Sequence, residues 1–108
     1  EILKKVADIL SALVRPQDAV GRWGGEEFLI LIPCKDVQVG LSVAERARTL
    51  LEQEKFYSSD DSITITASFG VTYTNTVADL IDLVAIADKA LYKAKDSGRN
   101  KVKYLPFK

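Results

Sequence analysis

Apolar residues recur at offsets of three and four in three stretches of the chain, which predicts three amphipathic helices. The first covers residues 1–14, the second covers residues 36–54, and the third follows Thr76. Asp36 is placed to open the second helix by accepting a backbone N–H. Thr76, with Asp79 three residues later, resembles a capping box for the third.

Apolar runs and strict alternation predict the strands. Residues 19–23 and 28–32 flank Gly24-Gly25, which indicates two strands around a tight turn. The second of these runs has no polar alternation, so we expect a central strand buried on both faces. Residues 57–62 read as a polar loop, and residues 63–74 alternate so regularly that they predict one long strand.

The order of the elements predicts an α+β fold, with helices packed on a mostly antiparallel sheet. Gly98 is placed to stop the third helix, and residues 101–105 would add a short edge strand after it. The length of 108 residues fits one domain. Because the chain contains no methionine and begins at Glu1, we expect a piece of a larger protein.

Composition excludes several kinds of chemistry. The chain has no histidine, which excludes His-based acid–base catalysis and imidazole metal sites. Cys34 is the only cysteine, so no intrachain disulfide is possible. Fifteen basic residues balance fifteen acidic ones, which argues against nucleic-acid binding, although residues 89–108 carry seven basic residues and one acidic residue. No apolar run approaches the roughly 18 residues of a membrane span, and we expect a soluble, cytoplasmic domain.

Two short segments could bind a metal ion and phosphate. Gly24 and Gly25 would let the backbone approach a ligand, while Glu26 and Glu27 supply hard oxygen ligands suited to Mg²⁺. A plain hairpin turn with solubilising acids explains the same residues. Lys95 and Arg99, four residues apart across a helix end, could converge on a polyphosphate. The alternative is that these two cations only offset the helix dipole.

A third segment, Arg15-Pro-Gln-Asp18, joins the first helix to the hairpin. Its guanidinium and carboxylate could grip a guanine base by its hydrogen-bonding edges. A surface ion pair is the alternative. Arg46, on the second helix, can likewise be a solvated charge on a helix face.

In their order along the chain, these segments resemble the GGDEF-domain diguanylate cyclases. The matching motifs are Arg15-Pro-Gln-Asp18, Arg22-Trp-Gly-Gly-Glu-Glu-Phe28, Ala44-Glu-Arg-Ala-Arg48, Thr66-Ala-Ser-Phe-Gly-Val71, Ala87-Asp-Lys-Ala-Leu-Tyr-Lys-Ala-Lys95 and Gly98-Arg-Asn100. The turn has the Gly-Gly-Glu-Glu-Phe form that this family also uses. The resemblance implies a nucleotide-cyclase or palm-like fold with a ferredoxin-like core.

The resemblance also implies a reaction and a set of site residues. Two GTP molecules on facing domains of a homodimer would be joined into cyclic di-GMP, with release of two pyrophosphates. Glu26 would bind Mg²⁺ or Mn²⁺ and Glu27 would support the site. Gly24 and Gly25 would let the nucleotide phosphates approach the backbone of the turn. Lys95 and Arg99 would bind the triphosphate. Arg15, Asp18 and Arg46 would form the inhibitory site that binds the product.

The chain differs from the family pattern on its N-terminal side. It starts after the point where members carry a first strand with a metal-binding Asp and the guanine-recognition residues, so residues 1–108 are expected to be a GGDEF domain truncated on its N-terminal side. We therefore predict that this chain alone is inactive. The larger protein would add a sensor domain, and a membrane anchor would leave this domain on the cytoplasmic side. Two other hypotheses stay open, a cyclic di-GMP receptor without catalysis and a structural or dimerisation piece.

Overall fold

Residues 2–107 are described by a computed structural model with three helices and six strands. In chain order the elements are α1 (Ile2–Leu13), β1 (Ala19–Gly24), β2 (Glu27–Leu31), α2 (Val37–Gln53), β3 (Phe56–Ser58), β4 (Asp61–Ile63), β5 (Phe69–Val71), α3 (Leu80–Asp96) and β6 (Val102–Tyr104). The predicted α+β class is confirmed. The three helices, the glycine hairpin and the final strand lie within a few residues of their predicted positions.

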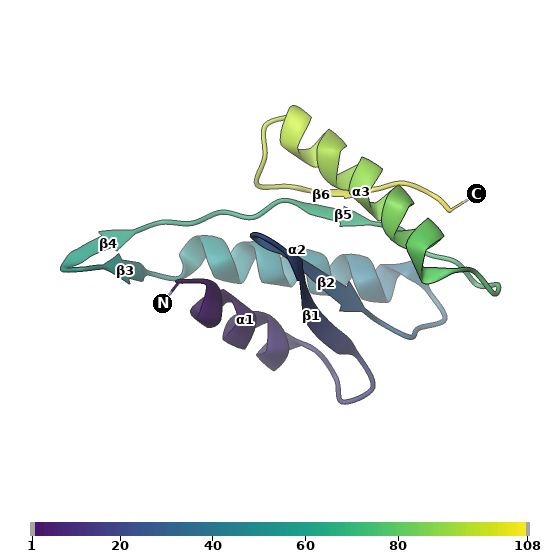
Figure 1. Cartoon of the computed structure of the whole chain (residues 1–108), viewed down its shortest axis with the longest axis horizontal. Helices are drawn as coiled ribbons and strands as arrows, with labels where there is room; N and C mark the ends of the chain where they lie inside the picture. Colours follow the sequence, from purple (N-terminus) through teal and green to yellow (C-terminus); the bar gives the residue numbers. More distant parts are fainter. Residues whose placement is uncertain (1, 108) are drawn as a thin grey trace.

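The strands form three separate two-stranded sheets (Figure 1). β1 and β2 are antiparallel, as are β3 and β4, whereas β5 and β6 run parallel and are connected through α3. A parallel pair needs such a long crossover because its strands start at the same end. Within the described residues, β2 and β5 each pair with one strand only.

Two strand predictions are wrong. The apolar run at residues 28–32 is not buried on both faces: Phe28, Leu29 and Ile30 are half-buried and Leu31 is exposed, because β2 has only β1 as a neighbour. The long strand at residues 63–74 is reduced to β5 and the last residue of β4. Alternation makes a segment suitable for a sheet, but a strand also needs a partner along its length, and β6 offers β5 only three residues.

The polar loop predicted at residues 57–62 is instead part of the β3–β4 hairpin. Phe56 pairs with Ile63, and Ser59 takes a φ of 57° in the turn. Figure 1 shows this hairpin extended from one end of the molecule, which measures 49 Å along its longest axis.

The helix ends are held in different ways. The Asp36 side chain accepts the Gln38 backbone N–H at 2.9 Å, so its predicted capping role is confirmed. The predicted capping box is wrong: Asp79 caps α3 without a side-chain hydrogen bond, and Thr76 is hydrogen-bonded to Thr74. Gly98 follows α3 with a φ of 118°, as expected for a residue that stops a helix.

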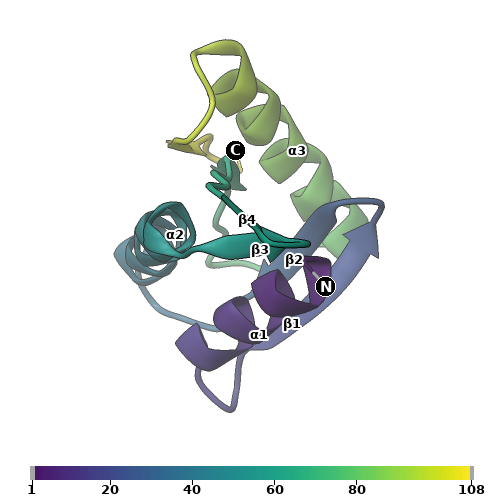
Figure 2. The ribbon, with the colours of Figure 1, turned by 90° about the vertical axis from the view of Figure 1, so that its left-hand side faces the viewer.

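The core lies around α2, which contacts α1 below and the β5–β6 pair above (Figure 2). The buried apolar side chains of the described residues are mostly small, and they are Leu10, Ala44, Ala47, Leu51, Phe56, Ala90 and Ala94. β5 lies so close to α3 that a Cβ on Gly70 would overlap backbone atoms of Ala87 and Leu91. None of the helices within residues 2–107 is long and apolar enough to cross a membrane.

Candidate functional site

The glycine turn leaves open space in front of the hairpin. Gly25 has a φ of 52°, a left-handed conformation that glycine adopts without a steric penalty. The Arg22 guanidinium donates from Nε to the Gly25 carbonyl oxygen at 2.9 Å and braces the turn. A Cβ built on Gly24 or Gly25 would meet nothing within 4 Å, so a bulky ligand can approach this backbone.

The two carboxylates beside the turn, Glu26 and Glu27, are exposed. Neither makes a hydrogen bond or an ion pair with another residue of the described chain. Across residues 2–107 no three acidic, histidine or cysteine side chains gather into a metal-binding group. Mg²⁺ typically takes one or two protein carboxylates and completes its shell with water and phosphate oxygens, and these two unpaired carboxylates fit that mode.

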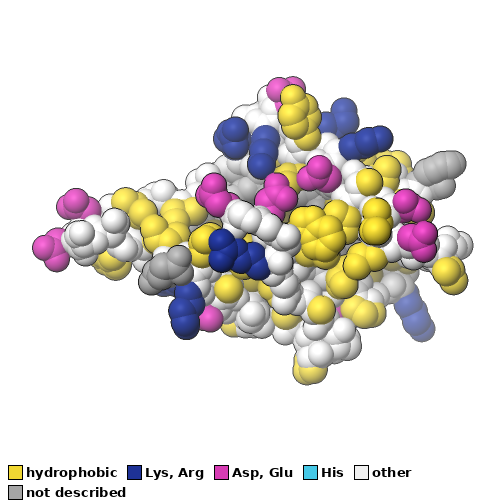
Figure 3. Space-filling view, in the orientation of Figure 1, with side chains coloured by type: hydrophobic (Ala, Val, Ile, Leu, Met, Phe, Trp, Pro, Cys, Tyr) yellow, Lys and Arg dark blue, Asp and Glu magenta, His cyan; other side chains and the backbone are white. Residues whose placement is uncertain are grey.

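Lys95 and Arg99 lie at the C-terminal end of α3, where both are exposed. The Ser97 hydroxyl donates to the Lys93 carbonyl oxygen at 2.7 Å, and the Arg99 N–H donates to that of Ala94 at 3.0 Å. Neither the Lys95 ammonium nor the Arg99 guanidinium has a hydrogen-bond partner within residues 2–107. Figure 3 shows basic side chains gathered around this helix. These cations both offset the helix dipole and remain available to an anion.

The structure does not join the carboxylate turn to the basic end of α3. In the part of the chain that it describes, no hydrogen bond or ion pair links Glu26 or Glu27 with Lys95 or Arg99. The hairpin β1–β2 and the pair β5–β6 belong to different sheets. Any ligand that contacted both groups would therefore bridge two separately packed regions.

Arg15 and Asp18 are brought together at the opposite end of the β1–β2 hairpin. The Arg15 guanidinium donates from Nε to Asp18 Oδ2 at 3.1 Å and from Nη2 to Asp18 Oδ1 at 2.9 Å. The Arg15 backbone N–H also donates to Asp18 Oδ2 at 2.8 Å, and Nη2 reaches the Pro33 carbonyl oxygen at 2.7 Å. The ion pair considered from the sequence is thus formed.

This ion pair leaves only Arg15 accessible to a ligand. The Asp18 side chain is 1% exposed and accepts from Arg15 on both oxygens, whereas 41% of the Arg15 side chain is exposed. Hydrogen bonds from Arg15 lower the pKa of Asp18 below its ordinary value, and hydrogen bonding to Asp18 raises the pKa of Arg15. Asp18 therefore orients the guanidinium, and Nη1 of Arg15 has no hydrogen-bond partner among the described residues.

Arg46 lies exposed on α2, in a shallow depression with Glu45, Thr49 and Leu50. Within residues 2–107 no hydrogen bond or ion pair connects Arg46 to Arg15 or Asp18. The structure therefore does not bring Arg46 into the Arg15 site of the same chain.

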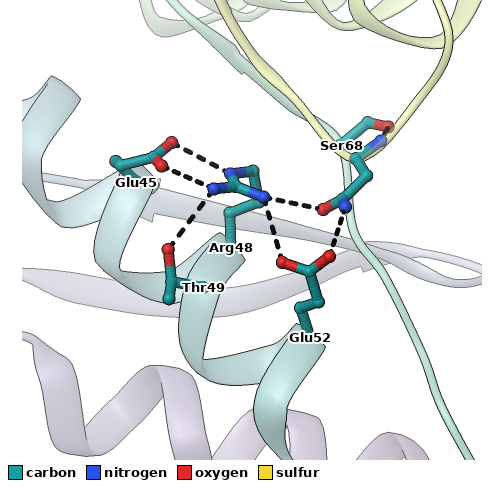
Figure 4. Close-up of polar contacts among 6 residues, drawn as sticks. Glu45, Arg48, Thr49, Glu52 and Ser68 are labelled. Atoms are coloured by element: carbon teal, nitrogen blue, oxygen red, sulfur yellow. Dashed lines mark hydrogen bonds and ion pairs between the residues drawn. The ribbon is translucent and has the colours of Figure 1, made fainter.

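Sequence reasoning missed the most connected polar side chain, Arg48. Its guanidinium binds Glu45 in a two-point ion pair, Glu52 at 3.4 Å and the Asn100 side chain at 3.1 Å (Figure 4). The pKa of Glu45 is lowered chiefly by its hydrogen bonds from Arg48. Spacings of three and four along α2 could have indicated the two glutamates, but nothing local indicates Asn100, which lies 52 residues away.

The helices, strand pairs and open glycine turn place this molecule in the palm-like α+β class of nucleotide cyclases. The chain belongs to the family described as diguanylate cyclase, GGDEF domain, whose family model matches residues 1–101. Both the predicted family and the predicted fold are confirmed. Members of this family generally need a divalent metal ion.

Named relatives agree with this assignment. Diguanylate cyclase A of Treponema denticola is 35% identical over 102 residues, which cover 94% of this chain and 28% of that protein. The active GGEEF domain of a diguanylate cyclase from Vibrio cholerae superposes with a TM-score of 0.80 at 29% identity, over 95% of this chain and 65% of that one. The GGDEF domain of DgcB from Caulobacter crescentus, in complex with c-di-GMP, superposes with a TM-score of 0.88 at 25% identity. The match covers 95% of this chain and 62% of that one. The chain thus spans little more than a quarter of the length of the curated relative.

Proposed function

We propose that the complete protein joins two GTP molecules into cyclic di-GMP and releases two pyrophosphates. The observation that carries this proposal is the open Gly24-Gly25 turn, flanked by carboxylates that no cation within residues 2–107 neutralises. The activity implied by the names of its relatives supports it. In each half-reaction the 3′-oxygen of one GTP forms a bond to the α-phosphorus of the other. The bond between that α-phosphorus and the oxygen bridging to the β-phosphorus breaks, pyrophosphate leaves with this oxygen, and the 3′-hydroxyl proton passes to solvent.

The residues of this chain would contribute mainly by position and charge. Gly24 and Gly25 let phosphates lie against the turn, and Glu26, supported by Glu27, would hold Mg²⁺ or Mn²⁺. The ion supplies positive charge against the phosphate oxygens. Glu26 also helps to activate the attacking 3′-hydroxyl. Such chemistry needs no histidine.

Lys95 and Arg99 would hold the triphosphate from the side of α3. An ammonium and a guanidinium neutralise phosphate oxygens as a point charge and as a planar fork of donors. Both side chains are exposed and have no hydrogen-bond partner among the described residues, so neither must break a contact to bind. A GTP between the hairpin and α3 would therefore connect two regions that the chain itself leaves separate.

Two copies of the domain are needed, because each would present one GTP to the other. We propose a homodimer with facing sites, controlled by a sensor domain elsewhere in the complete protein. Arg15 would bind the product through Nη1, which has no hydrogen-bond partner among the described residues, while Asp18 keeps the guanidinium in place. Arg46 of a neighbouring domain would complete this inhibitory site, which agrees with the lack of any hydrogen bond between Arg46 and Arg15 within residues 2–107.

The second candidate is a receptor that binds cyclic di-GMP without making it. One observation favours it: the Arg15–Asp18 pair is formed within a single chain, whereas the carboxylate turn is not joined to Lys95 or Arg99. The two candidates differ in turnover and agree on product binding.

The experiment measures both properties. Calorimetric titration of the chain with cyclic di-GMP should show binding that Arg15→Ala abolishes and Arg22→Ala, a change at the other end of β1, leaves intact. In the complete protein, Glu26→Gln should lower pyrophosphate release from GTP by about a hundredfold or more, since it removes a charge acting on the reacting phosphates. Product binding without any turnover by the complete protein would establish the receptor, and no binding of either nucleotide would refute both candidates.

A further inference from the structure

We infer that Arg48 and Glu52 on α2 are positioning residues for Arg99, and that they act by holding both ends of the Asn100 side-chain amide. The inference rests on the proposed function, which assigns Arg99 to the triphosphate of GTP. It concerns residues that lie outside the assigned site.

The loop after α3 has an unusual backbone. Three consecutive residues have positive φ, at 118° for Gly98, 60° for Arg99 and 50° for Asn100. Glycine takes such a conformation freely and asparagine tolerates it, but arginine rarely does. A run of this kind persists only where surrounding contacts determine it, so the loop needs support from outside itself.

That support comes from α2 and from the segment before β5. Asn100 Oδ1 accepts from Arg48 Nη1 at 3.1 Å, and Asn100 Nδ2 donates to Glu52 Oε2 at 2.9 Å. The Asn100 backbone N–H donates to Ser68 Oγ at 3.1 Å. Figure 4 shows the cluster between the helix and the neighbouring loop. Asn100 is thus held at its backbone and at both amide atoms, directly beside Arg99.

The hydrogen bonds that hold the Asn100 side chain require these particular residue types. Arg48 also hydrogen-bonds Glu45 and Glu52, and only 19% of its side chain is exposed, so its guanidinium is fixed in direction. Lysine has no planar fork with which to bind the four partners of Arg48 at once, which are Glu45, Thr49, Glu52 and Asn100. An aspartate at position 100 would place a carboxylate against Glu52. Arg48 therefore serves as the donor and Glu52 as the acceptor for the two ends of the Asn100 side-chain amide.

The test uses variants that keep the fold but release the loop. Asn100→Gly removes the side-chain hydrogen bonds to Arg48 and Glu52, while glycine accommodates a φ of 50° without strain. Arg48→Lys keeps the positive charge but not the planar guanidinium. The control is Glu54→Gln, which removes the carboxylate of the residue that caps the C-terminus of α2 and pairs with Lys5 at 2.9 Å. Binding of GTP with Mg²⁺ is followed by nuclear magnetic resonance titration of the chain, which detects weak affinities, and folding is followed by urea unfolding.

Both loop variants should bind GTP about tenfold more weakly, because ordering a released backbone opposes binding. Glu54→Gln should bind as the unchanged chain does, and cyclic di-GMP binding at Arg15 should be the same in all. A merely structural brace would lower the urea midpoint and leave the affinity of the folded chain unaltered, which would refute the inference.

Arg99→Ala separates failure of the inference from failure of the proposed function. If Arg99→Ala loses GTP binding while Asn100→Gly keeps it, the positioning role is wrong and the proposed function stands. If the unchanged chain and Arg99→Ala bind GTP equally, or neither binds, the triphosphate role of Arg99 is wrong and the inference falls with it.

Discussion

The hairpin β1–β2 and the unit formed by α3, β5 and β6 carry the two halves of the proposed GTP site, and they are packed in opposite ways. In the α3 unit, Ala90 and Ala94 have no exposed surface and Gly70 lies against the helix backbone. In the hairpin, all of β1 except Val20 is exposed, and a Cβ on Gly24 would contact nothing within 4 Å. The helix that carries the cationic half of the site is thus fixed by packing, whereas the hairpin that carries the carboxylate half stands open.

The largest difference in stability between the two regions is expected from a substitution at Gly70. Gly70→Ala should lower the free energy of unfolding by about 3 kcal/mol or more, because the added methyl overlaps backbone atoms of α3 that cannot rotate away. Urea unfolding monitored by circular dichroism measures the loss. The matched change in the hairpin, Gly24→Ala, should cost less than about 1 kcal/mol, since the space in front of it is open. Equal losses in the two variants would contradict the comparison.

An intermediate effect is expected at Gly25. Gly25→Ala should cost about 1 kcal/mol, because alanine must adopt a φ of 52° where glycine has no steric penalty. The same urea experiment measures it. Gly24→Ala is again the control, as it differs in backbone conformation and not in available space. A Gly25→Ala chain as stable as the Gly24→Ala chain would show that the turn is not held in this conformation.

The smallest effect is the pH dependence of the Arg15–Asp18 pair. The pKa of Asp18 is lowered from an ordinary value of 3.8, chiefly by hydrogen bonding to Arg15. The ionised carboxylate therefore stabilises the folded chain above about pH 4, and this contribution is lost as the pH falls from 3.8 through the lowered pKa. Urea midpoints of the unchanged chain and Asp18→Asn should differ at pH 6 and converge on acidification. A gap that stays constant down to pH 2 would show that the pair does not determine it.

Much of the fold could be predicted because the relevant signals are local. The helix periodicities, the Asp36 cap and the glycine stop at Gly98 each depend on residues within a few positions of one another. The Arg15–Asp18 ion pair was also visible as a spacing of three. The remaining site residues are predicted only by the family resemblance, which depends on the order of motifs along the whole chain and not on local spacing.

Some of the errors arise where the outcome depends on a distant partner, and others arise at short local features. Residues 63–74 have the alternation of a long strand, yet only residues 69–71 pair with β6. The β3–β4 hairpin was missed because its arms are three residues each and its turn is polar, which together look like a loop. Arg48 appeared only as part of a motif, because its contact with Asn100 exists only once α3 and β6 have formed.

The single pairing of β2 has a consequence for the behaviour of the chain in solution. Residues 28–32 form an uncharged, wholly apolar run, and the edge of β2 away from β1 has no strand partner among the described residues. Unpaired apolar edges are templates for further strands from other molecules. Self-association should therefore rise with concentration in light scattering, and Ile30→Lys should suppress it. If the edge acts in this way, the fraction of monomer should fall steadily as the chain is concentrated.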